Sequence, residues 1–224
     1  MIRIYGVPVS VHTRKPLVVA RLKGIAVESV PVIPFDPPAD WRTLSPTGLI
    51  PAMVDGDLSL TDSTSICAYL DRLSPKPPIY GEGARGFAQS LAVEHYAGTL
   101  FQRVVQPLFF QTVVRPRILQ QGPADEAVVR QVLDKDAPEI FAVLEGWLAG
   151  GAMGAGALLI GEITVASNLV NFRYLGFSIE DTRFPRLAAF FRSIAATRVF
   201  RDQLEAEKPF AERMGLDRGF IAAL

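Results

Sequence analysis

Cysteine and histidine are scarce in this chain of 224 residues, which contains one cysteine (Cys67) and two histidines (His12 and His95). A single cysteine excludes an internal disulfide framework and a Cys-x-x-Cys redox or zinc pair. The two histidines form no pattern typical of a metal site, and no G-x-S-x-G turn is present. We therefore expect no bound metal and no Ser-His-acid catalytic set.

The chain also lacks net charge, because 23 Lys and Arg residues balance 23 Asp and Glu residues. A neutral chain has no overall field that attracts nucleic acid or an anionic membrane. The first ten residues, MIRIYGVPVS, lack the long apolar core of a signal peptide. The apolar stretch 142–161 contains Glu145 and many glycines, which is typical of a loop rather than a membrane span. We expect a soluble, cytoplasmic protein with no nucleic-acid or membrane partner.

Hydrophobic residues, by contrast, make up 49% of the chain, and near its first quarter they form a hairpin pattern. The apolar run 50–54 meets Asp55-Gly56, a tight-turn dipeptide, and is followed by alternation over 58–60. Three helix-capping residue types at 61–63 then precede apolar residues at helical spacing over 66–73. The pattern predicts two antiparallel strands that lead directly into a helix.

The preceding residues predict a strand, a helix and a second strand. Residues 2–5 are typical of a short strand, Ser10 stands where a helix begins, and Gly24 ends that helix. Residues 26–33 are rich in Val and Ile and are followed by prolines, which favours an edge strand. The whole order of elements predicts a thioredoxin-like α/β domain over residues 1–75.

The sequence changes character after the proline-rich linker 74–78. From residue 85 to 224 we expect an all-α domain, because helical periodicity dominates and no strand-like alternation interrupts it. The predicted helices of this domain are 87–114, 125–148, 164–175, 185–196 and 199–207.

Two motifs in the hairpin region resemble a known family. The segment from Pro46 to Pro51 reads P-x-G-x-I-P, and the segment from Leu60 to Leu70 reads L-x-D-S-x-x-I-x-x-Y-L. Both resemble the glutathione-binding core of the cytosolic glutathione transferases, and the serine in the first turn resembles bacterial members. The resemblance implies an N-terminal thioredoxin-like domain and an all-helical C-terminal domain that carries the pocket for an electrophile. In that helical domain the segment 158–166 resembles the family's buried capping box, with Thr164 as the N-cap and Ser167 as its partner three residues later. The resemblance also implies a homodimer with glutathione as co-substrate and a small apolar electrophile as second substrate.

Ser10 is the candidate catalytic residue. It stands at the start of a helix, where unpaired backbone N–H groups favour an anion. The resemblance implies that its hydroxyl donates a hydrogen bond to the glutathione sulfur and holds it as a thiolate. The alternative is that Ser10 serves only as an N-cap, which uses the same location.

The resemblance assigns glutathione binding to five residues. Asp62 and Ser63 answer the ammonium and carboxylate of the γ-glutamyl group, although the family more often has Glu at the first position. Ile50 pairs through its main chain with the cysteinyl part, before a cis Pro51. Arg42 meets the glycyl carboxylate. The alternatives are that Asp62 and Ser63 are ordinary helix caps and that Arg42 is a solvated surface charge.

Two departures from the family pattern keep other functions open. Val11-His12 follows the serine where relatives often have Pro-Phe. We expect His12 to be exposed at the helix start, and the alternative is that it faces the substrate cleft. The chain is therefore either a transferase or a non-catalytic protein of the same fold that binds a ligand or partner. A glutathione-dependent isomerase, dehalogenase or disulfide reductase is the third option. The isomerase is disfavoured, because isomerase relatives carry a Ser-Cys pair that this first turn lacks.

Overall fold

The computed structural model describes residues 1–154 and 156–224, and of Ala223 only the backbone. The chain divides into two compact units. The first comprises Met1–Ile79 together with Thr197–Phe210, and the second comprises Tyr80–Ala196 together with Ala211–Leu224. The predicted domains, 1–75 and 85–224, stay a prediction.

The first unit is built on a four-stranded sheet in the order β2-β1-β3-β4. Strand β1 pairs in parallel with β2 and antiparallel with β3, and β3 pairs antiparallel with β4. The predicted strands and the edge position of β2 are confirmed. The strands are Ile2–Tyr5 (β1), Val27–Val30 (β2), Ala52–Asp55 (β3) and Leu58–Thr61 (β4).

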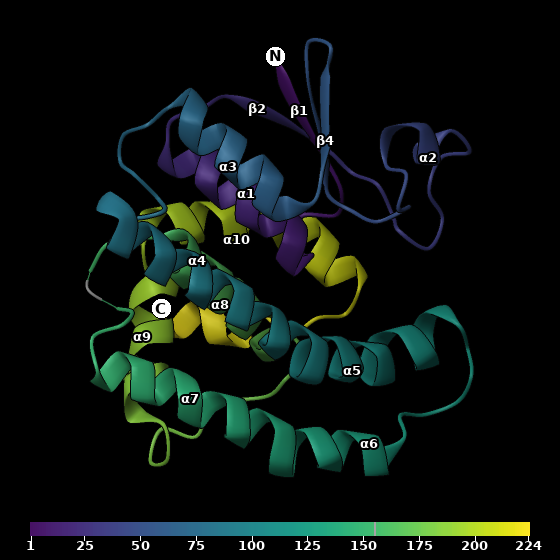
Figure 1. The fold of residues 1–224 in the computed structure, drawn as a ribbon. Coiled ribbons are helices and arrows are strands. Elements are labelled where there is room, and N and C mark those ends of the chain that lie inside the picture. Colours follow the sequence, from purple (N-terminus) through teal and green to yellow (C-terminus); the bar gives the residue numbers. More distant parts are fainter. Residues whose placement is uncertain (155) are drawn as a thin grey trace. The chain divides into compact units, whose positions relative to one another are not determined.

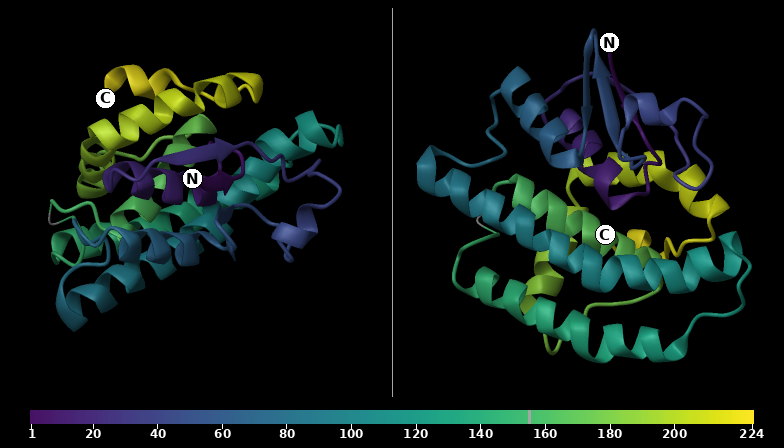
Figure 2. Two further views of the ribbon diagram at one scale, coloured as in Figure 1. Left: turned by 90° about the horizontal axis from the view of Figure 1, so that it is seen from above. Right: turned by 45° about the vertical axis from the view of Figure 1, so that its right-hand side comes forward.

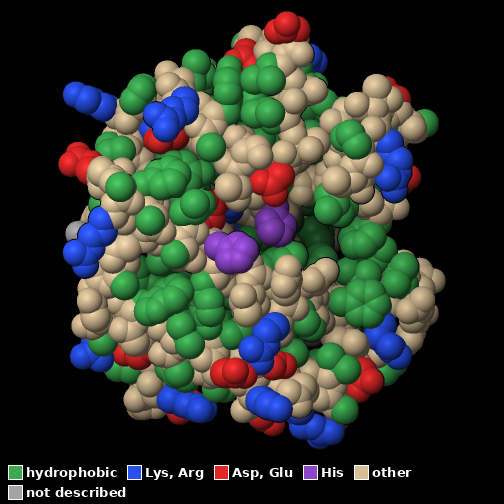
Figure 3. Space-filling model, in the orientation of Figure 1, with side chains coloured by type: hydrophobic (Ala, Val, Ile, Leu, Met, Phe, Trp, Pro, Cys, Tyr) green, Lys and Arg blue, Asp and Glu red, His purple; other side chains and the backbone are tan. Residues whose placement is uncertain are grey.

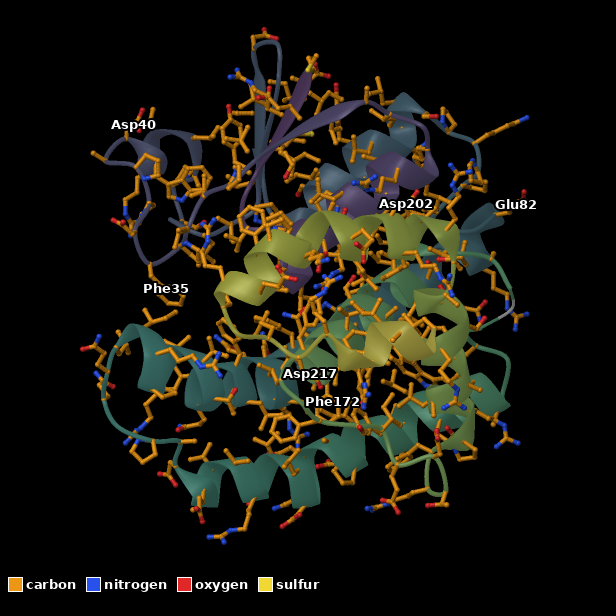
Figure 4. The ribbon with its side chains drawn as sticks, turned by 180° about the vertical axis from the view of Figure 1, so that it is seen from behind. Phe35, Asp40, Glu82, Phe172, Asp202 and Asp217 are labelled. Atoms are coloured by element: carbon orange, nitrogen blue, oxygen red, sulfur yellow. The ribbon has the colours of Figure 1, made fainter. Side chains whose placement is uncertain are left out.

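Helices cover this sheet on both faces. Helices α1 (Val11–Leu22) and α3 (Ser63–Leu73) pack side by side on one face (Figures 1 and 2). The short helix α2 (Trp41–Leu44) lies on the other side of the sheet, where Trp41 packs with Val32 and Ala52. The connection that leads to α2 carries Phe35 and Asp40, both exposed (Figure 4). Helix α10 (Arg198–Arg213) completes the unit, since its residues as far as Phe210 belong here.

The proline-rich linker is tied to the first unit. No helix or strand occupies residues 74–82, as expected from their prolines. Lys23, at the end of α1, donates from Nζ to the carbonyl oxygens of Ser74 (2.6 Å) and Pro77 (2.7 Å). The same ammonium lies 2.7 Å from Asp71 Oδ1. Two main-chain carbonyls of this segment therefore share one side-chain partner, Lys23, although the segment has no regular structure.

The regular elements in the described residues of the second unit are all helices, which confirms the predicted all-α class. Its core contains edge-on aromatic pairs. Phe141 lies 5.5 Å from Phe172 and 5.6 Å from Phe184, measured between ring centroids, and Figure 4 labels Phe172. A continuous run from Gly83 to Ile118 comprises α4 (Gly83–Leu100), η1 (Phe101–Val105), α5 (Gln106–Phe109) and η2 (Phe110–Ile118). The other elements are α6 (Glu126–Gln131), η3 (Val132–Asp136), α7 (Ala137–Ala149), α8 (Ile160–Tyr174), α9 (Pro185–Ala195) and η4 (Gly219–Ala223).

The predicted N-cap at Thr164 is wrong. Helix α8 already begins at Ile160, and Leu159 is its N-cap. Thr164 lies inside the helix, and its hydroxyl donates to the carbonyl of Ile160 (2.7 Å). In the first turn Glu162 accepts from the backbone N–H of Gly154 (3.1 Å), and a carboxylate there complements the helix dipole. The helix thus starts four residues earlier than the sequence pattern indicates, and Glu162 connects its first turn to the preceding loop.

Position 6 requires glycine for two reasons, its backbone conformation and the close approach of Thr13 and Ile50. Its φ is 146°, and a Cβ built there would lie 2.5 Å from Thr13 Oγ1 and 3.2 Å from Ile50 Cβ. The residue directly after β1 is therefore packed against the residues before β3 and in α1. Only glycine leaves room for this contact.

We predict that Gly6→Ala lowers the free energy of unfolding by about 3 kcal/mol, because it adds overlap to backbone strain. Urea unfolding followed by circular dichroism measures the change. Gly24→Ala is the matched control, since Gly24 also has positive φ (65°) but no atom lies near its added Cβ. It should cost only about 1 kcal/mol. Equal losses in the two variants would contradict the packing argument.

Candidate functional site

Three chain segments meet at one end of the sheet. Tyr5, the last residue of β1, is opposite Ala52, the first of β3, and Ala52 is opposite Thr61, the last of β4. We call this end, defined by these three residues, the site edge. The turn that follows β1, the residues before β3 and the residues after β4 all leave the sheet there. The register therefore gathers the segments that carry Ser10, Ile50-Pro51 and Asp62-Ser63.

Ser10 occupies the N-cap position of α1, with φ −68° and ψ 133°. Its backbone N–H donates to Val7 O (3.0 Å), and its carbonyl accepts from the N–H of Arg14 (2.8 Å). Its side chain makes no capping hydrogen bond, and the residue is partly buried. The hydroxyl thus stands at the helix start without serving as the cap. Its role toward a thiolate stays a prediction.

Asp62 and Ser63 lie at the start of α3. One carboxylate oxygen of Asp62, Oδ1, accepts from the N–H groups of Thr64 (2.8 Å) and Ser65 (3.2 Å). Asp62 is exposed and has a positive φ of 80°, whereas Ser63 is buried. The interpretation of Asp62 as a helix cap is confirmed. Binding of a γ-glutamyl group by these two residues stays a prediction.

Ile50 and Pro51 immediately precede β3. The peptide bond between them is cis, as expected, and Pro51 is buried. Ile50 is half-buried and packs against the cluster that contains Trp41. Main-chain pairing of Ile50 with a peptide ligand stays a prediction.

Arg42 lies apart from these contacts on α2. Its Nη1 donates to the carbonyl of Pro46 (3.2 Å), and the guanidinium lies over Gly48. Nearby, Trp41 Nε1 donates to Gly48 O (3.1 Å). Among the described residues, no hydrogen bond or ion pair connects Arg42 with Ser10, Asp62 or Ser63. The side chain is exposed, and its binding role stays a prediction.

Residues 4–78 match the N-terminal domain family of glutathione S-transferases. A glutathione S-transferase from Triticum aestivum is 25% identical over 209 residues, which cover 93% of this chain and 95% of that protein. The solved structure of glutathione transferase F2 from Populus trichocarpa has a TM-score of 0.78 at 20% identity, and covers 93% of this chain and 100% of its own. The chain has the glutathione transferase fold. The sequence matches support a place in a glutathione transferase family, and the wheat protein shows that its relatives include plant members.

A further solved structure of the transferase fold contains a glutathione derivative. It is described as glutathione S-transferase-I bound with the ligand lactoylglutathione. Its TM-score is 0.78 at 20% identity, and the match covers 90% of this chain and 97% of that one. At this identity the likeness shows the fold alone.

Sequence reasoning missed two residues of α1 beside the predicted site. Lys15 is buried, and its Nζ donates to the hydroxyl of Thr64 in the first turn of α3 (3.3 Å). His12 was expected to be exposed, but it is partly buried. Burial, helped by the charge of Lys15 and opposed by that of Asp62, lowers the pKa of His12 to about 4. The signal available in the sequence was helical spacing, since residues 12 and 15 lie on one face of α1.

Two hollows, one in each unit, are lined by other residues than those of the predicted site. One, of about 390 Å³, is lined by α1, β2 and α10 and includes Arg21 and Gln203. Another, of about 400 Å³, lies in the second unit and includes Phe172 and Phe184. Neither is lined by a predicted site residue. On the face shown in Figure 3, side chains of both charges are scattered rather than gathered by sign.

Among the residues that the structure describes, no group of three or more His, Cys, Asp or Glu side chains is placed to hold a metal ion. No helix in that part of the chain is both long enough and apolar enough to cross a membrane.

The low pKa of His12 predicts a pH dependence of stability. Between pH 6.5 and about 4 the unfolded chain binds a proton that the folded state does not, so stability falls over that window as pH falls. The loss is at most about 3 kcal/mol and is complete below the folded pKa. Urea unfolding at about pH 7.5 and about pH 4.5 measures it, and His12→Asn should reduce this slope. His95→Asn, at an exposed position, is the control and should leave the slope unchanged.

Proposed function

We propose that this chain is a serine-type glutathione transferase, which adds the glutathione thiolate to a small apolar electrophile. The observation that carries the proposal is Ser10 at the N-terminus of α1, with a side chain not engaged in capping. The segment that carries Ser10 extends from the same site edge as the segments that carry Ile50-Pro51 and Asp62-Ser63. The sequence match over residues 4–78 and the bound glutathione derivative in a structure of the same fold support it.

The energetics of thiol activation are compatible with one hydroxyl at a helix start. Lowering a thiol pKa from ~8.5 to ~6.5 requires roughly 2.7 kcal/mol. A charge-assisted hydrogen bond contributes ~1.5–3 kcal/mol, and a helix terminus adds ~0.3–1 kcal/mol. At pH 7 the thiolate fraction then rises from about 3% to about 75%. This gain is only about twentyfold, so positioning of the electrophile must provide much of the remaining rate.

The other site residues bind the peptide in this proposal. Ser63 and the N-terminus of α3 receive the γ-glutamyl carboxylate, and Asp62 faces its ammonium. Capping uses Asp62 Oδ1, and a carboxylate has further acceptor capacity for a ligand. The main chain of Ile50, next to Pro51, pairs with the cysteinyl part. Arg42 meets the glycyl carboxylate, because its guanidinium has more donors than the one engaged by Pro46.

The proposal extends to assembly and location. Residues 1–75 form the glutathione-binding domain, and residues 85–224 carry the pocket for the electrophile. The protein is a homodimer in the cytoplasm, and its reaction uses glutathione as co-substrate without a metal.

Two measurements on Ser10 test the activity. Calorimetry should detect glutathione binding, and absence of heat at millimolar ligand would refute the proposal. In a spectroscopic conjugation assay, Ser10→Ala should lose at least about tenfold in kcat/KM, as expected for one hydrogen bond to a developing charge. Ser59→Ala, which truncates an exposed serine on β4, is the matched control and should retain full activity. An unchanged rate in Ser10→Ala would remove the catalytic role.

The two functions of Asp62, capping and binding, are separable. Asp62→Asn keeps an oxygen that caps α3 nearly as well, so the free energy of unfolding should change by less than about 0.5 kcal/mol. It removes the charge that faces the ammonium, so we expect glutathione affinity to fall about tenfold. Asp57→Asn, at an exposed carboxylate of the hairpin turn, is the control. Unchanged affinity by calorimetry would leave Asp62 as a cap only.

The capping bonds of Asp62 also favour a second function, a non-catalytic protein of this fold that binds a ligand or partner. A carboxylate held at its own helix is less available to glutathione than a longer glutamate. Binding of glutathione without turnover of any electrophile in a broad panel would support this function. Turnover by isomerisation, dehalogenation or disulfide reduction would instead support the other glutathione-dependent reactions.

A further inference from the structure

A buried ion pair joins α1 to α10 within the first unit. Arg14 Nε donates to Glu207 Oε1 and Arg14 Nη2 to Glu207 Oε2, each at 2.7 Å. Both side chains are fully buried, although 193 residues separate them in sequence. Gln203 Nε2 also donates to Glu207 Oε1 (3.0 Å). Two parallel charge-assisted bonds fix the plane of the guanidinium as well as its position.

The same guanidinium also holds the turn that precedes Ser10. Arg14 Nη2 donates to the carbonyl oxygen of Val9 (3.2 Å), the residue directly before Ser10. The N–H of Arg14 in turn donates to Ser10 O (2.8 Å). The main chain on both sides of the Ser10 Cα is therefore bound to Arg14. A shift of this guanidinium would therefore act on the carbonyl group directly before Ser10.

We infer that Glu207 is a positioning residue, which fixes the main chain at Val9 through Arg14 and thereby aims the Ser10 hydroxyl. This inference rests on the proposed function for its catalytic consequence, but not for its structural one. A displacement of about 1 Å at a catalytic group is enough to lower a rate about a hundredfold. Glu207 is fully buried against Arg14, so in this inference it influences the reaction through Arg14 and not by contact with glutathione.

A positioning role and a purely electrostatic role of Glu207 predict opposite changes in the pKa of the glutathione thiol when its carboxylate is removed. Loss of the Glu207 carboxylate leaves the charge of Arg14 uncompensated, and a nearby positive charge lowers a thiol pKa. Loss of the correct Ser10 geometry removes a hydrogen bond to the thiolate and raises that pKa. The direction of the change therefore distinguishes a positioning residue from a merely electrostatic one.

The test compares Glu207→Gln with wild type in a conjugation assay. We expect kcat to fall about tenfold or more while the KM for glutathione changes less than about threefold. The pKa of bound glutathione, from the absorbance of its thiolate against pH, should rise. Asp71→Asn is the matched control, because it removes the carboxylate of a second ion pair in this unit, with Lys23 at 2.7 Å. A lower thiol pKa, or equal changes in the control, would overturn the inference.

A milder variant keeps the test valid if Glu207→Gln does not fold. Glu207→Asp retains the charge but is one methylene shorter, so it cannot reach both nitrogens of an undisplaced Arg14. It should raise the thiol pKa in the same direction, since only geometry has changed. A thiol pKa equal to that of wild type in this variant would contradict the positioning role.

Hydrogen exchange in the ligand-free protein separates this inference from the proposed function. The Ser10 amide is bonded to Val7 O (3.0 Å), so its exchange rate reports how well the turn is held. Glu207→Asp should exchange this amide about tenfold faster than wild type does, whereas Asp71→Asn should not. If the wild type neither binds nor conjugates glutathione, the proposed function fails while this measurement still decides the positioning role. Equal exchange in the two variants would refute it.

Discussion

The pairing of β3 between β1 and β4 determines where the candidate site lies. Its register sets Tyr5, Ala52 and Thr61 in one row, so three connections leave the sheet at the same end. A shift of one residue would turn every side chain of β3 to the other face. Both residues at the centre of this strand pair, Ile4 and Met53, are fully buried, which makes such a shift costly. The position of the site thus follows from the packing of the core.

Helix α1 shows how the first unit accommodates basic residues in its interior. Arg14, Lys15 and Lys23 are all buried, and each has a defined oxygen partner. A buried charge is costly unless hydrogen-bond partners or an opposite charge compensate for its lost hydration. Arg14 is bound by a carboxylate from α10, Lys15 by a hydroxyl of α3 and Lys23 by main-chain carbonyls and Asp71. These polar contacts make the orientation of α1 specific, which apolar packing alone does less well.

Local signals in the sequence predicted the strands, the hairpin and the all-helical second half, because these follow from periodicity and turn residues. The cis bond before Pro51 and the cap at Asp62 were also predictable, since both belong to short motifs. The burial of His12 and the partner of Arg14 were not, because both depend on residues distant in sequence. The early start of α8 was missed for a similar reason, since Glu162 is bonded to the loop before it. Local patterns carry no information about such contacts.

The return of residues 197–210 to the first unit limits how this chain can be divided. A fragment that ends at Ile79 would contain the whole sheet and α1, but it would lack the carboxylate of Glu207 that lies against Arg14. Residues 1–79 therefore do not contain all the contacts of the first unit and cannot be exchanged alone without losing this ion pair. Recombination with another member of this fold would have to exchange the arginine and its distant acidic partner together. The need to exchange both residues together is not evident from the sequence, because 193 positions separate them.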